Sequence, residues 1–290
     1  VEAEQAGRSI GILESLQLFV FDRLVFSKIR SQLGMNSVRL AFSGAAPLNP
    51  EVCKFFHAIG IRIAEGYGQT EDCGPTSVNP PEKIKIGTVG PPIPGVTVKI
   101  AEDGEILVKG GNVFRGYYKN PEATAETLKD GWLYSGDIGT MDDDGYITIT
   151  DRKKDLIITA GGKNVAPQEL ESRLQLAPLI DQAVVVGDQR KFLAALITLD
   201  QEAVEKWAKE KGKEGKSMAE LVGDSDLVAE IQKVVDEVNS HFSSAESIKK
   251  FKLLEKPFTI DGGEITPTLK VRRRNIVEKY AALIEEMYAE

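Results

Sequence analysis

Chemistry-bearing residues are most concentrated in one short stretch, where Gly66, Tyr67, Gly68, Thr70 and Glu71 fall within six positions. The two glycines allow the backbone to approach a ligand closely, and the Tyr67 ring offers a flat face for stacking a purine. Thr70 supplies a hydroxyl for a phosphate oxygen, and Glu71 supplies a carboxylate oxygen of the kind that Mg²⁺ prefers. The stretch predicts a nucleotide-phosphate site, although a tight turn with one buried Tyr is an equally good interpretation of this motif alone.

Two further turns carry candidate ligand-binding residues. Gly44 and Ala45 belong to a run of small residues that leaves room for a base or an acyl chain, unless it is an ordinary turn. Asp137 follows Gly136 in a predicted turn, and its carboxylate could accept hydrogen bonds from both hydroxyls of a ribose. An isolated Asp is more commonly a turn or cap residue.

A third group of candidates lies in the C-terminal half. The charged run 151–155 is a plausible hinge, because a solvated link can change conformation with little loss of core contact. Lys270 follows Thr-Pro-Thr-Leu, a stiffened loop that limits its movement, so its ammonium could stabilise developing negative charge. A lone Lys in a loop is otherwise solvated, and Arg272–Arg274 is interpreted as a solvated face in preference to a phosphate site.

Hydrophobic periodicity predicts the elements that position these residues. The first part of the chain alternates helix and strand, which indicates part of an α/β sheet with ligands at the carboxyl ends of its strands. Its predicted elements are a helix over 8–34, a strand over 38–42, a helix over 50–59 and a strand over 61–64 that empties into a loop at 65–71.

From about residue 87 the pattern becomes β-rich and predicts a small barrel or meander. An Asp-Gly pair at 103–104 between alternating runs predicts a hairpin. After residue 155 a compact α+β pattern follows. The predicted strands lie at 96–100, 105–108 and 146–150 in the β-rich part, and at 156–159, 183–186 and 194–199 in the α+β part. The α+β part is also predicted to contain helices at 167–176, 201–211 and 225–241, a hairpin around 261–263 and a last helix that includes 276–287.

Composition excludes several classes of protein. The net charge of −8 argues against a partner that is a nucleic acid. The two cysteines, Cys53 and Cys73, are expected to be reduced, buried thiols, which fits a cytoplasmic location. Two histidines without ligand spacing make a zinc site improbable. Rossmann and Walker A motifs are absent from the sequence, and no apolar run is long enough to span a bilayer.

Four segments in order carry a resemblance to a known family. Gly-Tyr-Gly-Gln-Thr-Glu at 66–71, Tyr-Ser-Gly-Asp at 134–137, the segment 151–164 and Thr-Pro-Thr-Leu-Lys at 266–270 resemble the motifs of the adenylate-forming superfamily. That superfamily includes acyl-CoA synthetases, luciferases and peptide-synthetase adenylation domains. The resemblance implies the α/β and α+β fold of these enzymes: residues 1–151 would be the C-terminal portion of the large domain (α/β part about 1–85, β-rich part about 86–151), and 152–290 a mobile lid domain.

The resemblance also implies roles for the candidate residues. Thr70, Glu71 and Lys270 would be catalytic, with Glu71 as the Mg²⁺ ligand, and Lys154 would be the hinge. The nucleotide, ATP or AMP, would be bound by Gly44, Ala45, Gly66, Tyr67, Gly68, Thr70, Asp137 and Arg152. The loop that lines the CoA tunnel would consist of Gly161, Gly162 and Lys163.

The sequence segments around 28–48 and 151–169 look closest to those of long-chain fatty acyl-CoA synthetases. These enzymes convert a fatty acid and ATP to acyl-AMP, and then transfer the acyl group to CoA. The alternatives are another acyl- or aryl-acid ligase, or an inert fragment that only binds. The family's phosphate-gripping loop ending in Pro-Lys-Gly does not occur in the sequence, so we expect it in a missing N-terminal portion. Peripheral contact of the whole protein with a membrane is left open.

Overall fold

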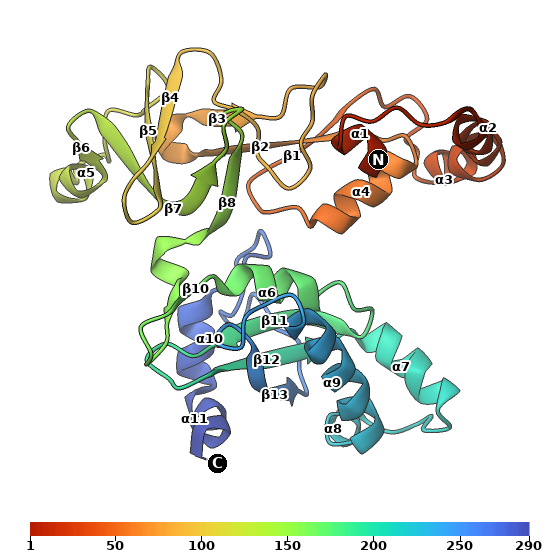
Figure 1. Cartoon of the computed structure of the whole chain (residues 1–290). Helices are drawn as coiled ribbons and strands as arrows, with labels where there is room; N and C mark the ends of the chain where they lie inside the picture. The colour runs from red at the N-terminus through yellow and green to blue at the C-terminus, as the bar shows by residue number, and fades with distance from the viewer. Residues whose placement is uncertain (290) are drawn as a thin grey trace. The chain divides into compact units, whose positions relative to one another are not determined.

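The computed structural model describes residues 1–289 and divides the chain into two compact units, Val1–Thr150 and Asp151–Glu290 (Figure 1). The sequence places the break one residue later, after 151. Each unit is described by itself below. That the second unit is a mobile lid stays a prediction.

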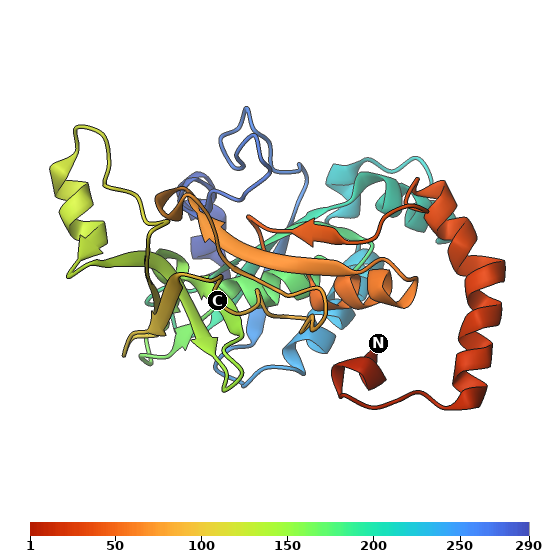
Figure 2. The same cartoon turned by 90° about the horizontal axis from the view of Figure 1, so that it is seen from above.

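The first unit begins with helices α1 (Glu2–Gln5), α2 (Ile12–Phe21) and α3 (Ser27–Gln32), the last two joined by a π-helical segment, Asp22–Phe26. The predicted helix over 8–34 is therefore present but starts later. Gly11 is the N-cap, and its backbone N–H donates to the Glu14 carboxylate at 2.9 Å. Figure 2 shows α2 and α3 as one long arc at the edge of the unit.

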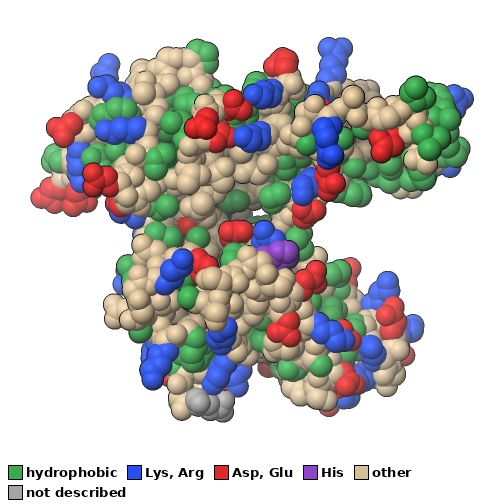
Figure 3. Space-filling view, viewed as in Figure 1, with side chains coloured by type: hydrophobic (Ala, Val, Ile, Leu, Met, Phe, Trp, Pro, Cys, Tyr) green, Lys and Arg blue, Asp and Glu red, His purple; other side chains and the backbone are tan. Residues whose placement is uncertain are grey.

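The apolar face of this arc is not covered. Ile12, Leu16 and Phe19 are 92%, 60% and 64% exposed, and no residue of α2 is buried. Figure 3 shows the hydrophobic side chains gathered over α2 and α3. Exposed apolar patches of this kind mark surfaces that bind something else.

A three-stranded sheet follows, in the order β1 (Ala41–Ser43), β2 (Ile63–Gln69) and β3 (Gly74–Val78). Helix α4 (Pro50–Ala58) links β1 to β2, which run parallel, whereas β3 is antiparallel to β2. The strand predicted at 61–64 is thus displaced, and most of the predicted loop at 65–71 is strand. Only Thr70–Asp72 forms a turn, a short 3₁₀ helix.

The β-rich part is a meander of five strands. The order is β4 (Val96–Ile100), β5 (Glu105–Gly110), β7 (Trp132–Met141) and β6 (Leu128–Lys129), with β8 (Ile147–Arg152) paired to β7 and helix α5 (Pro121–Thr127) before β6. The predicted hairpin between β4 and β5 is confirmed, with Gly104 at φ +85°. The core contains Val98, Ile106, Val108, Leu133, Ile147 and, from β2, Tyr67.

The second unit is built on a sheet in the order β11 (Ile180–Val186), β12 (Leu193–Leu199) and β13 (Ile248–Leu254). Strand β12 is antiparallel to β11 and parallel to β13. A separate antiparallel pair consists of β9 (Ile157–Ile158) and β10 (Asn164–Val165). The helices are α6 (Pro167–Leu174), α7 (Gln201–Glu210), α8 (Met218–Leu221), α9 (Ser225–Asn239), α10 (Arg273–Lys279) and α11 (Ala281–Ala289), and a 3₁₀ turn covers Lys153–Asp155.

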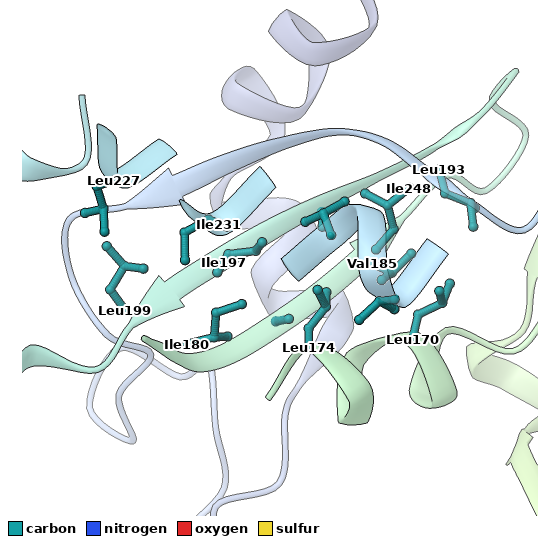
Figure 4. Packing of buried hydrophobic residues seen from close by; sticks show 14 of the residues in the cluster. Leu170, Leu174, Ile180, Val185, Leu193, Ile197, Leu199, Leu227, Ile231 and Ile248 are labelled. Atoms are coloured by element: carbon teal, nitrogen blue, oxygen red, sulfur yellow. The ribbon is translucent and has the colours of Figure 1, made fainter. Parts of the chain in front are cut away.

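Helices cover both faces of this sheet. All seven residues of β12 are buried, as expected for a central strand with two apolar neighbours. Alternation along β12 sends Ile197 toward α6 and α9, and Leu196 toward α10 and α11. Figure 4 shows the first face, where Leu170, Leu174 and Ile231 pack on the strands. The mixed α/β character predicted from sequence is confirmed.

Several local predictions are wrong. Residues 261–263 form no hairpin; the antiparallel bridge is instead Ile265 with Val271. Strand β13 was not foreseen, because its lysines obscure the alternation. Both cysteines are free, but only Cys53 is buried, and Cys73 is exposed. No helix in the described residues is long and apolar enough to cross a membrane.

Candidate active site

Two candidate residues that lie 70 positions apart meet in the first unit. The Tyr67 hydroxyl, on β2, donates a hydrogen bond to Asp137 Oδ2, on β7, at 2.7 Å. Both side chains are buried, at 8% and 4% exposure. Burial, followed by the nearby Asp137 charge, raises the pKa of Tyr67 far above its usual value, so the phenol remains a proton donor.

The surroundings of both residues differ from the prediction. The Tyr67 ring belongs to the core of the β-rich part, so the flat face expected to meet a purine is covered here, as in the alternative interpretation. Asp137 lies within strand β7 and not in a turn. The preceding Gly136 has φ +72°, and its N–H donates to the Glu105 side chain (Oε1) at 2.9 Å, where the pairing of β5 with β7 shifts register.

The predicted phosphate and metal residues lie in the turn after β2. Thr70 is exposed and Glu71 half-buried. Glu71 Oε1 accepts a hydrogen bond from the Tyr117 hydroxyl at 2.7 Å, and its carbonyl accepts from the Phe114 N–H at 2.8 Å. Tyr117 was not among the residues predicted from the sequence. Its ring packs edge-on against Phe114, with the ring centroids 4.9 Å apart.

A magnesium ion fits this turn only with ligands from a nucleotide. Asp72 is committed to the fold, since its carboxylate accepts from the Gln69 N–H at 2.8 Å and from the Thr76 hydroxyl at 2.6 Å. Among the described residues no group of three His, Cys, Asp or Glu side chains could hold a metal. Glu71 would supply the one protein carboxylate, since Mg²⁺ commonly binds one or two carboxylates together with several waters and substrate phosphates.

Close packing between neighbouring strands requires glycine in these turns, in addition to the proposed ligand contact. Parallel pairing of β1 with β2 brings Gly44 beside Gly66, and a Cβ on Gly44 would lie 3.1 Å from the Gly66 carbonyl oxygen. A Cβ on Gly68 would lie 1.9 Å from the Gly74 carbonyl oxygen, so only glycine fits between β2 and β3. Ala45 has φ +67°, a strained conformation that concentrates at functional sites.

The predicted hinge opens the second unit. Asp151 is buried and accepts hydrogen bonds from the Arg152 N–H at 2.6 Å and from the Gln168 N–H, at the start of α6, at 3.1 Å. Burial raises the pKa of Asp151 above its usual value. Arg152 and Lys154 are exposed. The hinge function of Lys154 stays a prediction.

The predicted CoA-tunnel loop is a tight turn between β9 and β10. The Gly162 N–H donates to the Thr159 carbonyl at 2.8 Å, and Gly162 has φ +76°. Gly161, Gly162 and Lys163 are all exposed. The Lys163 ammonium pairs with Glu246 at 3.3 Å. A Cβ on Gly161 would meet nothing closer than 3.9 Å, so its small size is not required by the turn itself.

Lys270 lies just before the closing bridge of a short hairpin, residues 265–271, which we call the Lys270 hairpin. The Thr266 N–H donates to the Lys270 carbonyl at 2.8 Å, and the Lys270 N–H donates to the Thr266 hydroxyl oxygen at 3.0 Å. Leu269 has φ +59°, which closes the turn. The Lys270 side chain is exposed and, within the described residues, takes part in no ion pair. Its backbone is therefore fixed while its ammonium remains available.

One preference about the neighbouring arginines is wrong. Arg272 and Arg274 are exposed, but Arg273 is half-buried and pairs with the buried Glu171 at 2.8 Å. In the first unit, Gly44 lies beside Gly66, and Tyr67 contacts Asp137. The second unit presents Lys270. That these groups share one site stays a prediction.

Comparison with known proteins identifies the family. Residues 17–118 match the family model described as AMP-binding enzyme, and residues 154–290 match the model of the AMP-binding enzyme C-terminal domain. The chain therefore belongs to the AMP-binding enzymes, which confirms the resemblance to the adenylate-forming superfamily.

Its curated relatives include fatty-acid ligases. A long-chain-fatty-acid–CoA ligase of Mycobacterium bovis is 50% identical over 279 residues, which are 96% of this chain and 46% of that protein. One from Gallus gallus is 38% identical over 293 residues, covering 92% of this chain and 38% of that protein. The chain spans about half the length, or less, of the curated relatives it matches.

Solved structures agree on the fold. The adenylation domain of a carboxylate reductase from Mycobacterium chelonae matches with a TM-score of 0.73 and 26% identity, over 99% of this chain and 44% of that one. O-succinylbenzoate coenzyme A synthetase from Bacillus subtilis, solved with ATP and magnesium ion, matches with a TM-score of 0.62 and 26% identity, over 82% of this chain and 46% of that one. The fold is that of adenylate-forming enzymes.

Proposed function

We propose that the chain is part of a long-chain fatty acid–CoA ligase that works in two half-reactions. First, the fatty carboxylate attacks the α-phosphorus of ATP, forming acyl-AMP and releasing pyrophosphate. Next, the thiol of CoA attacks the acyl carbonyl and releases AMP, giving the acyl-CoA thioester. The 50% identity to a long-chain-fatty-acid–CoA ligase over 96% of the chain supports this substrate class.

The observation that carries the proposal is the Lys270 hairpin. A backbone fixed at both ends of a tight turn carries an exposed ammonium with no ion-pair partner in the described residues. Such a preorganised cation suits the negative charge that develops on the α-phosphate and carboxylate oxygens. A surface lysine that served only solubility would not need a backbone fixed by these hydrogen bonds.

The remaining residues take the roles that the family implies. Thr70 would contact the phosphate, and Glu71 would hold Mg²⁺, which supplies charge neutralisation to the phosphates when bound. Asp137 would bind the ribose, and Arg152 would contact the ribose or the phosphates. For Asp137 this requires the carboxylate to accept ribose hydroxyls beside, or in place of, Tyr67. Rotation about Lys154 would then bring Gly161 to the site for the CoA step.

We also propose that these 290 residues act within a longer enzyme, called the full-length enzyme below. The phosphate-gripping loop of the family is absent from the sequence, and the chain covers 46% of the Mycobacterium bovis relative. The segment as given would therefore bind but not adenylate efficiently. A cytoplasmic location, where ATP and CoA are available, with peripheral membrane contact to receive fatty acid, belongs to this proposal.

The test is an acid panel with the full-length enzyme, ATP, Mg²⁺ and CoA. We expect pyrophosphate release and thioester formation with palmitate, and little with benzoate or acetate. Turnover with benzoate or acetate alone would support the alternative, another acyl- or aryl-acid ligase. The 290-residue chain assayed with palmitate should release no pyrophosphate above background. Robust turnover by it would contradict the requirement for a longer enzyme.

A further inference from the structure

The two ends of the Lys270 hairpin are each attached to a buried glutamate. Glu264 immediately precedes the bridge between Ile265 and Val271, and Arg273, which pairs with Glu171, stands two residues after it. Glu171 and Glu264 are among the few buried charged residues of the second unit. The hydrogen bonds within the hairpin already close it. The two attachments on either side of Lys270 are therefore not needed for closure.

The first attachment is centred on the Glu264 carboxylate, whose side chain is 2% exposed. One oxygen, Oε1, accepts from the Lys279 ammonium at 2.6 Å and from the Tyr280 hydroxyl at 3.2 Å. The other, Oε2, accepts from the Thr259 N–H at 3.0 Å. The Glu264 carbonyl accepts from the Arg272 N–H at 2.7 Å. Glu264 thereby ties the first strand of the hairpin to the end of α10.

The second attachment reaches the edge of the sheet. Strand β11 is an edge strand, so the N–H and C=O of Val185 that face away from β12 need other partners. Glu171 Oε1 accepts from the Val185 N–H at 2.7 Å, and Arg273 Nη1 donates to the Val185 carbonyl at 2.6 Å. Arg273 Nη2 also donates to Glu171 Oε2 at 2.9 Å. The hairpin is thus held in register with one residue of the sheet.

Stability alone is a poor reason to bury the carboxylates of Glu264 and Glu171. Desolvation of a buried ion pair largely offsets its attraction, and apolar replacements of similar volume are often as stable. What a buried, directional pair supplies is a unique geometry, and the planar guanidinium of Arg273 is suited to bonding two partners at once. Both pairs stand where such geometry would determine the orientation of Lys270.

We propose that Arg273 and Glu264 are positioning residues for Lys270: together they hold the hairpin at a fixed orientation on α10 and on the edge of β11. Neither touches substrate in this account. The inference rests on the proposed role of Lys270 in adenylation. It predicts that loosening either attachment impairs the adenylation half-reaction selectively, because thioester formation does not use Lys270.

The first experiment is hydrogen exchange on the 290-residue chain. The variants are Arg273→Lys, which keeps the charge but loses the forked donor, and Glu264→Gln. The control is Arg274→Lys, since Arg274 is exposed and pairs with Glu278 on its own helix. We expect the amides of Leu269 and Lys270 to lose roughly tenfold more protection than the amides of β12 in both variants, with the control unchanged. A loss of protection at the hairpin no larger than the loss at β12 would overturn the proposal.

The second experiment separates the half-reactions in the full-length enzyme. In Arg273→Lys, kcat for acyl-AMP formation should fall roughly 10- to 100-fold, with KM for ATP nearly unchanged, because a misplaced catalytic group costs turnover more than binding. Thioester formation from supplied acyl-AMP should stay at the wild-type rate. Equal losses in both half-reactions would indicate a merely structural role and overturn the proposal.

Lys270→Ala distinguishes failure of this inference from failure of the proposed function. If Lys270→Ala abolishes adenylation while Arg273→Lys and Glu264→Gln behave as wild type, only the positioning role is wrong. If Lys270→Ala adenylates normally, the proposed function of Lys270 is wrong, whatever the exchange data show.

Discussion

Glycines at the candidate site are of two physical kinds. At Gly68 an added Cβ would lie 1.9 Å from a backbone oxygen of Gly74, whereas at Gly161 it would meet nothing closer than 3.9 Å. We therefore expect Gly68→Ala to destabilise the first unit by about 3 kcal/mol or more, measured by denaturant unfolding. Gly161→Ala is the matched control and should unfold within about 1 kcal/mol of wild type. Similar losses of stability in the two variants would contradict the claim that only Gly68 is required by packing.

The Tyr67–Asp137 bond gives a second prediction for single residues. Tyr67→Phe removes the hydroxyl that donates to a buried carboxylate, so the first unit should lose about 1–3 kcal/mol of stability. Tyr118→Phe is the control, because the Tyr118 side chain is 89% exposed. Thermal or denaturant unfolding of both variants provides the measurement. A Tyr67→Phe protein as stable as wild type would show that the bond contributes nothing to the fold.

Residue types and spacing predicted which side chains to examine, but not their surroundings. Tyr67 and Asp137 were candidates for separate contacts with a nucleotide, and their bond to each other depends on the pairing of distant strands. Tyr117 was missed because nothing in its local sequence links it to Glu71, 46 positions away. Contacts between distant segments are the part of a site that one sequence does not specify.

At the scale of elements, the attachment of the Lys270 hairpin to α10 should depend on pH. Burial alone would raise the pKa of Glu264, but hydrogen bonds from Lys279 and the Thr259 backbone hold it below its usual value. The unfolded state then binds the proton more readily, so this stabilisation is complete above the ordinary glutamate pKa and is lost as pH falls through the folded value.

The consequence is a stability difference that shrinks in acid. Glu264→Gln should be less stable than wild type by about 1–3 kcal/mol near pH 7. The gap should narrow between roughly pH 5 and pH 3, where the wild-type carboxylate takes up its proton. Denaturant unfolding of both proteins across this range provides the measurement. A gap that stays constant or widens in acid would show that the charge of Glu264 does not support the second unit.

Element predictions succeeded where local sequence determines structure. The hairpin at 103–104 has its Asp-Gly turn, and the helix predicted from 167 begins there, at Pro167. Predictions failed where tertiary pairing decides. Strand β2 continues through the glycines at 66 and 68 because β3 pairs with them, and the Lys-rich β13 is a strand because it pairs with β12. The hairpin assigned to 261–263 forms at 265–271 instead, where Thr266 closes it.

For the molecule as a whole, the exposed apolar face of α2 and α3 should affect its oligomeric state in solution. Its apolar residues are exposed, and Arg30 attaches it to the rest of the first unit through the Ile59 carbonyl at 2.6 Å. We expect the 290-residue chain to self-associate at micromolar concentration through this face. The double variant Leu16→Lys, Phe19→Glu should sediment as a monomer in analytical ultracentrifugation. A monomeric wild-type chain under the same conditions would contradict this.

The central claim is that charge from Lys270 serves acyl-adenylate formation and not thioester formation. The most direct measurement is the rate of each half-reaction in the full-length enzyme carrying Lys270→Ala. We expect acyl-AMP formation from palmitate and ATP to fall by about 10²-fold or more, while thioester formation from supplied palmitoyl-AMP and CoA proceeds at the wild-type rate. Wild-type adenylation by this variant would contradict the account.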